Sequence, residues 1–291
     1  MHLTAKVAAT FAGVAATVAV AGPAHAAPAS DTVDVANVAH RGASAYAPEN
    51  TLAAVREGIN MEGDLIEVDV QRTKDGELVL VHDTNLARTT DVEQVFPDRA
   101  PWRVADFTYD EILQLDAGSW KSPKYAGEKI PTLTETIEVI RRSSAGLLLE
   151  VKAPELYPGI EADVARTMRA LPGYVESAVA AELLVVQSFN FSSMAIFKEL
   201  EPTIPVGLLG TPAATELPEL ATWADQINPH HKSVGADYVE AVHEAGMDCL
   251  VWTVDAVPDM DRAIDMGVDG VITNRPDVFE QVLHDRLRNS A

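Results

Sequence analysis

The chain has 291 residues and only one cysteine, Cys249. A single cysteine cannot form a disulfide within the chain, so a fold held together by disulfides is excluded. Because Cys249 begins a short apolar run, we expect a buried, unreactive thiol. The first 30 residues contain no cysteine, which argues against a lipid-anchored lipoprotein.

Basic residues are scarce. The chain has 22 Lys and Arg against 44 Asp and Glu, and a formal net charge of −22. The overall field of such a protein does not attract nucleic acid or an anionic membrane surface. An anionic substrate must therefore be held by local positive groups or by a metal ion.

Long hydrophobic runs are absent except at residues 7–21, which follow Lys6 and precede Ala24-His25-Ala26. A basic start, a short apolar stretch and an A-x-A end are typical of a secretory signal peptide, and the stretch is too short and alanine-rich for a good membrane anchor. We expect cleavage after Ala26 and a secreted, soluble protein of residues 27–291 without a stable membrane anchor. The sequence indicates no oligomeric state.

Nucleotide-binding motifs are also missing: no GxGxxG follows the first expected strand, and there is no P-loop. Instead, eight short apolar runs alternate with helical spacing such as Leu52, Val55 and Ile59. This alternation predicts an α/β fold, a closed (β/α)₈ TIM barrel, with an open doubly wound sheet as the alternative. The expected strands are 35–39, 65–70, 147–151, 184–189, 206–209, 225–228, 249–254 and 270–273.

Two segments interrupt the alternation. Residues 76–83 predict an extra strand paired with the second strand through the turn Lys74-Asp75-Gly76. Residues 84–131 are proline-containing and too long for a bare loop. We interpret them as an insertion that caps one end of the barrel.

Carboxylates occur where barrel strands should be apolar. Glu67 and Asp69 are two positions apart and so share one strand face, and Glu150 and Lys152 repeat this spacing. Three carboxylates at one barrel mouth would form an oxygen cage for one divalent cation, Ca²⁺ or Mg²⁺. The alternative is a structural ion-pair network with Lys152 and Arg41.

Two histidines end expected strands, His40 after the first and His82 after the extra strand. Histidine transfers protons near neutral pH, and Arg41 offers a fork for a phosphate or carboxylate. Gly42 permits close backbone approach or a positive φ. Together with the carboxylates, these residues suit metal-assisted attack on a phosphodiester.

Other candidates carry less weight. Gln187 and Phe189 end the fourth strand and Trp252 lies in the seventh, where core packing explains the aromatic residues equally well. Residues 49–51 (Glu-Asn-Thr) can be read as a helix cap. His230 and His231 are expected in a loop.

Six segments together resemble the glycerophosphodiester phosphodiesterase family, in order along nearly the whole chain after residue 26. They are HRGASAYAPENT, IEVDVQRTKDGELVLVHD, EVK, QSFN, VWTVD and GVDGVITNRP. The first two are specific, whereas the later ones are individually weak. The resemblance implies a (β/α)₈ barrel with a small insertion, and divalent-cation-dependent hydrolysis of glycerophosphodiesters to an alcohol and glycerol 3-phosphate.

The resemblance also implies roles. His40 and His82 correspond to the general acid and base, and Arg41 and Lys152 to phosphate contacts. Phe189 and Trp252 correspond to walls for the glycerol group. The metal ligands implied are Glu67, Asp69 and Glu150.

One departure concerns the last two motifs, where the family usually has Asn in the seventh strand motif and Asp in the eighth. Here they are Asp255 and Asn274, so we expect a bonded pair with reversed roles. Three alternatives stay open: a phospholipase D-like or lysophospholipase D-like enzyme, a wall-polymer hydrolase, and a non-catalytic binding protein. The first would need apolar surface, for which Phe96, Trp102, Phe107 and Trp120 are available.

Overall fold

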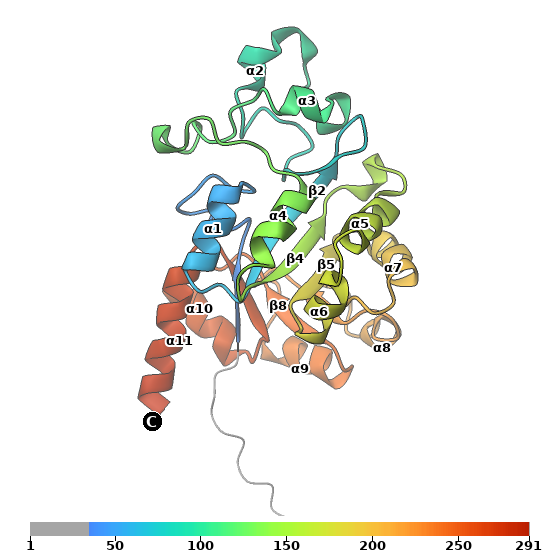
Figure 1. Ribbon diagram of the computed structural model, residues 1–291. Coiled ribbons are helices and arrows are strands. Elements are labelled where there is room, and N and C mark those ends of the chain that lie inside the picture. The colour runs from blue at the N-terminus through green and yellow to red at the C-terminus, as the bar shows by residue number, and fades with distance from the viewer. Residues whose placement is uncertain (1–34, 291) are drawn as a thin grey trace, which may run out of the picture. The chain divides into compact units, whose positions relative to one another are not determined.

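A computed structural model describes residues 35–290. The expected signal peptide, residues 1–26, lies outside them. Eight parallel strands form the expected closed barrel, because the first strand pairs with both the last and the second (Figure 1). They are β1 (Ala36–Ala39), β2 (Leu65–Arg72), β4 (Gly146–Val151), β5 (Leu184–Ser188), β6 (Val206–Leu209), β7 (Gln226–Asn228), β8 (Asp248–Val251) and β9 (Gly270–Thr273).

Each predicted strand is present within a few residues of its expected bounds, so the TIM barrel is confirmed and the open sheet is wrong. The extra strand β3 (Leu78–Leu80) pairs antiparallel with β2, as predicted. Cys249 is buried in β8 and free, also as expected.

Helices pack around the outside of the barrel (Figure 1). Threonine begins two of them: Thr51 accepts the amide of Ala54, and Thr132 forms a capping box with Glu135. The helices are α1 (Leu52–Asn60), α4 (Leu133–Ile140), η4 (Pro154–Leu156), α5 (Ile160–Arg169), α6 (Tyr174–Ala180), α7 (Phe191–Leu200), α8 (Leu217–Leu220), α9 (Ala236–Glu244), α10 (Val257–Asp265) and α11 (Pro276–Ser290).

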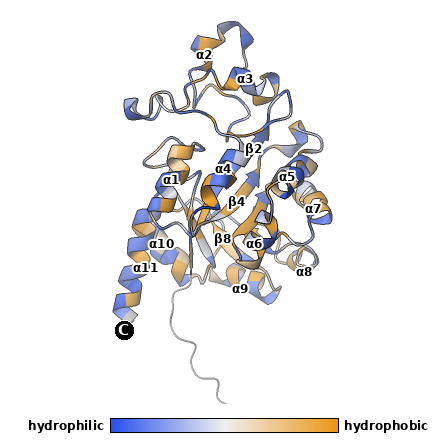
Figure 2. Cartoon of the chain, in the orientation of Figure 1, coloured by the Kyte–Doolittle hydropathy of each residue, from blue (hydrophilic) through white to orange (hydrophobic). Residues whose placement is uncertain are grey.

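Apolar side chains fill two layers. One layer lies between strands and helices and includes Ile66, Val68 and Phe197. The other lies inside the barrel and consists of Val38, Leu65, Leu148, Val185, Leu250 and Ile272. Figure 2 shows that β4 is mostly hydrophobic, whereas hydrophilic and hydrophobic residues alternate along α11.

The insertion of residues 84–131 lies beyond the carboxyl end of β2 (Figure 1) and has its own core around Phe107 and Leu86. Its later part is tied to the loop after β1, since Lys121 Nζ donates to the carbonyl oxygen of Ser44 (2.7 Å) and Tyr125 Oη to that of Tyr46 (2.9 Å). Its short helices are α2 (Val92–Val95), η1 (Pro97–Arg99), η2 (Val104–Asp106), α3 (Tyr109–Ile112) and η3 (Pro123–Tyr125).

Candidate active site

The turn after β1 places a histidine and an arginine at the mouth of the barrel. Arg41 and Gly42 both have positive φ, 53° and 75°. A Cβ atom on Gly42 would lie 2.4 Å from the backbone carbon of Ala54, so only glycine fits between this turn and α1. The left-handed pair reverses the chain at once and keeps both His40 and Arg41 beside the strand ends.

His40 is held in one orientation by the loop after β9. Its Nδ1 lies 2.6 Å from Oδ1 of Asn274. The Asn274 amide cannot be turned around, because its Nδ2 donates to Oδ2 of Asp255 (2.7 Å). Nδ1 of His40 therefore carries the proton, and Nε2 is left for the reaction. Burial, and then the charge of Arg41, lower the pKa of His40 to about 4 in the substrate-free protein.

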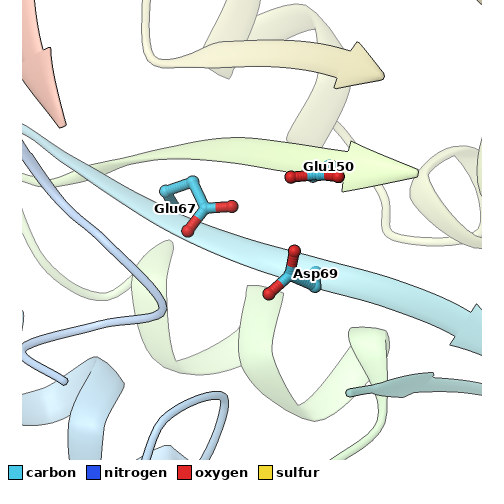
Figure 3. A group of neighbouring side chains, drawn as sticks. All are labelled: Glu67, Asp69 and Glu150. Carbon is cyan, nitrogen blue, oxygen red and sulfur yellow. The ribbon is translucent and has the colours of Figure 1, made fainter. Parts of the chain in front are cut away.

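Three buried carboxylates converge from two neighbouring strands. Glu67 and Asp69 project from β2, and Glu150 projects from β4 next to them (Figure 3). One oxygen from each lies within 4.8 Å of the others. Oδ1 of Asp69 is buried and accepts no hydrogen bond from any described residue. The cluster therefore has both the ligand type and a free ligand atom for a hard cation.

The carboxylates cannot all stay ionised in this space without added positive charge. Burial, and then the charges of Asp69 and Glu150, raise the pKa of Glu67 well above its ordinary value. Burial and Asp69 likewise raise the pKa of Glu150 to about 8. The pKa of Asp69 is lowered instead: burial opposes the shift, but Arg41 and Lys152, among other partners, outweigh it.

Asp69 is positioned by an asparagine in the segment before α1. Nδ2 of Asn50 donates to Oδ2 of Asp69 (2.8 Å), and the amide of Asp69 donates to Oδ1 of Asn50 (3.0 Å). Asn50 has a φ of 57°, a conformation that asparagine tolerates better than most residues. Nε of Arg41 lies 3.3 Å from the same carboxylate oxygen of Asp69.

His82, which follows β3, is linked to Arg41 through a chain of charged groups. Its Nδ1 lies 2.7 Å from Oδ1 of Asp83. Arg88 of the insertion donates to Asp83 (2.6 Å) and, through two nitrogens, to Glu49 (2.9 and 2.7 Å). Glu49 in turn accepts from Nη1 of Arg41 (2.9 Å). Arg88 of the insertion thus holds in place both the partner of His82 and the partner of Arg41.

The strand ends opposite supply a lysine and an aromatic wall. Nζ of Lys152 donates to Oε1 of Glu150 (2.7 Å) and lies 5.5 Å from the ring centroid of Phe189. The rings of Phe189 and Trp252 meet edge to face at 5.5 Å. Nε1 of Trp252 donates to the carbonyl oxygen of Asn228 (2.7 Å), which fixes the indole.

Gln187 lies on the floor between the lysine side and the aromatic wall. It is 1% exposed, and its Oε1 accepts from Nδ2 of Asn228 (2.8 Å). Oδ1 of Asn228 accepts the amide of Leu250 (3.3 Å), so neither side-chain amide can be reversed. Gln187 therefore turns its Nε2 donor away from Asn228.

Most of the residues singled out in the sequence come together here. Nine of them line one cavity of about 110 Å³: His40, Arg41, Glu67, His82, Glu150, Lys152, Gln187, Phe189 and Trp252. Asp69 lies in contact with Arg41 and completes the carboxylate cluster. His230 and His231 follow β7 and do not line this cavity. The ion pairs expected under the alternative interpretation are present, since Arg41 and Lys152 both contact the carboxylate cluster.

Known proteins are similar to this chain over most of its length. The sequence profile of the Glycerophosphoryl diester phosphodiesterase family matches residues 40–278. The chain belongs to this family.

Two relatives illustrate the match. A glycerophosphodiester phosphodiesterase of Caldanaerobacter subterraneus is 37% identical over 245 residues, 83% of this chain and 95% of the relative. One from Bacillus subtilis is 35% identical over 272 residues, 85% of this chain and 86% of the relative. Among solved structures, a phosphodiesterase of Oleispira antarctica in complex with the product sn-glycerol-3-phosphate superposes with a TM-score of 0.72. It is 30% identical and covers 85% of this chain and 96% of its own.

Asp255 and Asn274, the two exchanged residues of the last motifs, form a hydrogen-bonded pair, as predicted. Asp255 accepts from both the backbone amide (2.9 Å) and Nδ2 (2.7 Å) of Asn274. The exchange has a consequence that the sequence did not reveal. It presents an amide oxygen, and not a carboxylate, to Nδ1 of His40, and the carboxylate of Asp255 lies one hydrogen bond further away.

Sequence reasoning missed four residues that position the catalytic groups: Glu49, Asn50, Asp83 and Arg88. Thr51 does cap α1, as expected, but its two neighbours in the same segment bind Arg41 and Asp69. A signal existed, because a polar Pro-Glu-Asn segment directly before a helix has more hydrogen-bonding groups than a cap needs. Arg88 had no comparable signal.

Proposed function

We propose that the protein hydrolyses glycerophosphodiesters to an alcohol and glycerol 3-phosphate at this mouth of the barrel. The observation that carries the proposal is the convergence of two histidines, two cationic side chains and three carboxylates on one cavity. Membership of the family and the homologues' names support the same reaction.

We assign one divalent cation, Ca²⁺ or Mg²⁺, to Glu67, Asp69 and Glu150. The orphaned buried oxygen of Asp69 and the raised pKa of Glu67 and Glu150 both support a bound cation. Such a cation acts as a Lewis acid toward a phosphoryl oxygen when bound. Its all-oxygen ligands suit both ions.

Side chains of the protein would bind the phosphate and transfer the protons. Arg41 and Lys152 point their charges into the same cavity and would hold the phosphate and oppose its developing charge. His40 and His82 are the proton carriers, each oriented through Nδ1 so that Nε2 serves the substrate. A bound phosphodiester offsets the field of Arg41, one cause of the low pKa of His40, and so favours its protonation.

Phe189 and Trp252 would form the walls of a glycerol subsite, because their rings line the cavity and meet edge to face. The nucleophile is either water or the 2-hydroxyl of the substrate's glycerol. A cyclic phosphate detected by ³¹P NMR during turnover would support the hydroxyl route. Direct incorporation of ¹⁸O from water without a cyclic species would support water.

The structure offers little apolar surface in the insertion for a phospholipase D-like or lysophospholipase D-like enzyme. Of the four insertion aromatics that were available for a lipid surface, Phe107 is fully buried, and Phe96 and Trp102 pack against the insertion's core. Only Trp120, 39% exposed, is left on the surface. A small soluble diester therefore fits better than a long-chain lysolipid. A non-catalytic barrel would not need the intact set of proton carriers.

We further propose that residues 1–26 are a signal peptide and that residues 27–291 are secreted as one barrel domain. The support is the sequence pattern at residues 6–26 together with the family match, which begins at residue 40. Among residues 35–290, the structure contains no helix that is long and apolar enough to cross a bilayer. Mass spectrometry of the protein recovered from culture medium tests the cleavage site. A mature chain that still begins before Ala26 would contradict it.

The first test is release of glycerol 3-phosphate from glycerophosphocholine by the purified protein. We expect turnover that EDTA abolishes and that Ca²⁺ or Mg²⁺ restores, and no turnover by His40→Ala. No turnover by the wild type with either ion, on this or on other glycerophosphodiesters, would overturn the proposed reaction.

A further inference from the structure

A second open cavity, of about 360 Å³, adjoins the reaction centre. Its walls come from the loop after β1, from Trp120 and Lys121 of the insertion, and from Arg275 after β9. His40 and Arg41 line both this cavity and the catalytic one. A phosphodiester held by these two residues therefore faces both cavities at once.

The catalytic cavity is smaller than either of the two open cavities that adjoin it. It measures about 110 Å³, and Phe189 and Trp252 line it. If the glycerol group occupies it, as under the proposed function, the alcohol on the other side of the phosphate needs separate space. Two open cavities adjoin the site and could supply it.

The two neighbouring cavities differ in their access to a proton. One, of about 490 Å³, is lined by Glu150, Lys152, Phe189 and the segment around Glu155, and neither catalytic histidine lines it. The other contains His40. Because an alkoxide leaving group needs a proton from a nearby acid, the His40 side suits departure of the alcohol.

The cavity beside His40 has more cationic than anionic side chains, since Arg41, Lys121 and Arg275 line it together with the carboxylates of Glu49 and Asp255. Glu49 pairs with Arg41 and Arg88, whereas Asp255 accepts hydrogen bonds from the neutral side chains of Thr273 and Asn274. Nζ of Lys121 donates to the carbonyl oxygen of Ser44 (2.7 Å), a neutral group. Arg275 is hydrogen-bonded to the Tyr46 side chain and lies in the field of Asp277 and Asp255, so Lys121 is the less compensated of the two cations.

We propose that this second cavity binds the leaving alcohol and favours alcohols that carry an anionic group of their own, such as a further phosphate. This inference rests on the proposed function. Lys121 and Arg275 would contact that group while the phosphodiester stays on Arg41. The whole chain has twice as many acidic as basic residues, so its overall field would repel such a substrate, and the local cations reverse that preference.

The test uses three matched glycerol 3-phosphodiesters whose leaving alcohols share a two-carbon chain and end in phosphate, hydroxyl or trimethylammonium. Release of glycerol 3-phosphate is measured for each with the metal-loaded protein, and the readout is the ratio of kcat/KM between phosphate-ended and hydroxyl-ended substrates. We expect Lys121→Gln and Arg275→Gln each to lower this ratio about threefold, as for a partly exposed charge contact.

Two control variants sharpen the readout. Lys124→Gln removes a charge from the same segment, but Lys124 lies over the Tyr125 ring (4.5 Å) and does not line the cavity, so the ratio should hold. Glu155→Gln alters the charge of the other cavity. A ratio that responds to Glu155→Gln and not to Lys121→Gln, or that no variant changes, overturns this proposal while hydrolysis itself stands. Absence of turnover on all three diesters overturns the proposed function and this inference with it.

Discussion

The two ends of the barrel interior are built from the same strands and differ in every chemical respect. Val38, Leu65, Leu148, Val185 and Leu250 pack against one another toward the amino ends. Two positions later on the same strands come His40, Glu67, Glu150, Gln187 and Trp252 at the mouth. Since inward positions recur every second residue, each of these five strands contributes one inward residue to the apolar layer and the next inward residue to the mouth.

The lower layer contributes to the free energy of folding, and the carboxylates of the upper layer reduce it. Burial of the lower layer stabilises the barrel. Glu67 and Glu150 in the upper layer are destabilising without a cation, because they are removed from water beside a like charge. Substitutions in the two layers should therefore change different quantities.

The largest effect is expected for Glu67→Gln. Loss of a proposed metal ligand should lower kcat/KM about 1,000-fold or more. The same change should stabilise the metal-free protein by about 1 kcal/mol, because it replaces a buried carboxyl group whose ionisation is unfavourable and keeps an oxygen that can accept from the amide of Arg41. Activity assays and denaturation in EDTA measure the two effects. A variant that is both inactive and less stable would show that Glu67 is mainly structural.

Leu148→Ala tests the lower layer. Leu148 is fully buried inside the barrel, so its truncation should cost about 3 kcal/mol of unfolding free energy. Below the unfolding transition, kcat/KM should stay within a few fold of wild type. Leu148→Met serves as the volume-conserving control. A large loss of kcat/KM in folded Leu148→Ala would mean that the layers are not separable.

Asn50→Ala probes how the mouth is held from outside the strands. The variant loses both hydrogen bonds to Asp69, so metal affinity should fall about 10-fold to 100-fold. Titration calorimetry with Ca²⁺ and Mg²⁺ measures the affinity. Because Asn50 has a positive φ, Asn50→Gly is the matched control: it relieves the backbone but also lacks the side chain. Recovery of affinity in Asn50→Gly would assign the loss to backbone strain.

The smallest effect concerns a paired carboxylate of the mouth. Burial by itself would raise the pKa of Asp83, but hydrogen bonds from Arg88 and His82 outweigh this effect and lower the pKa to about 2. A lowered pKa stabilises the folded state above the ordinary Asp range, and this stability is lost as the pH falls from about 4 to about 2. After allowance for solvent screening we expect about 1 kcal/mol.

Acid unfolding of Asp83→Asn beside wild type, both in EDTA, measures that contribution. The two stability curves should converge at the acid end, whereas Asp98→Asn, an exposed insertion residue, should follow wild type throughout. Parallel curves for Asp83→Asn and wild type would remove Asp83 from the paired groups that stabilise the mouth.

The strands, the barrel and the candidate site residues could be predicted from the sequence. The prediction follows from local rules: apolar runs alternate with helical spacing, and Glu67 with Asp69 or Glu150 with Lys152 share a strand face because the strand period is two. Three contacts could not be predicted in this way: Asn50 binds Asp69, Arg88 links His82 to Arg41 through Glu49, and Asn274 turns its oxygen to His40. The second cavity, beside His40, likewise could not be predicted from the sequence. These contacts join residues far apart in the chain, and they arise when barrel closure brings separate loops together, which no local period encodes.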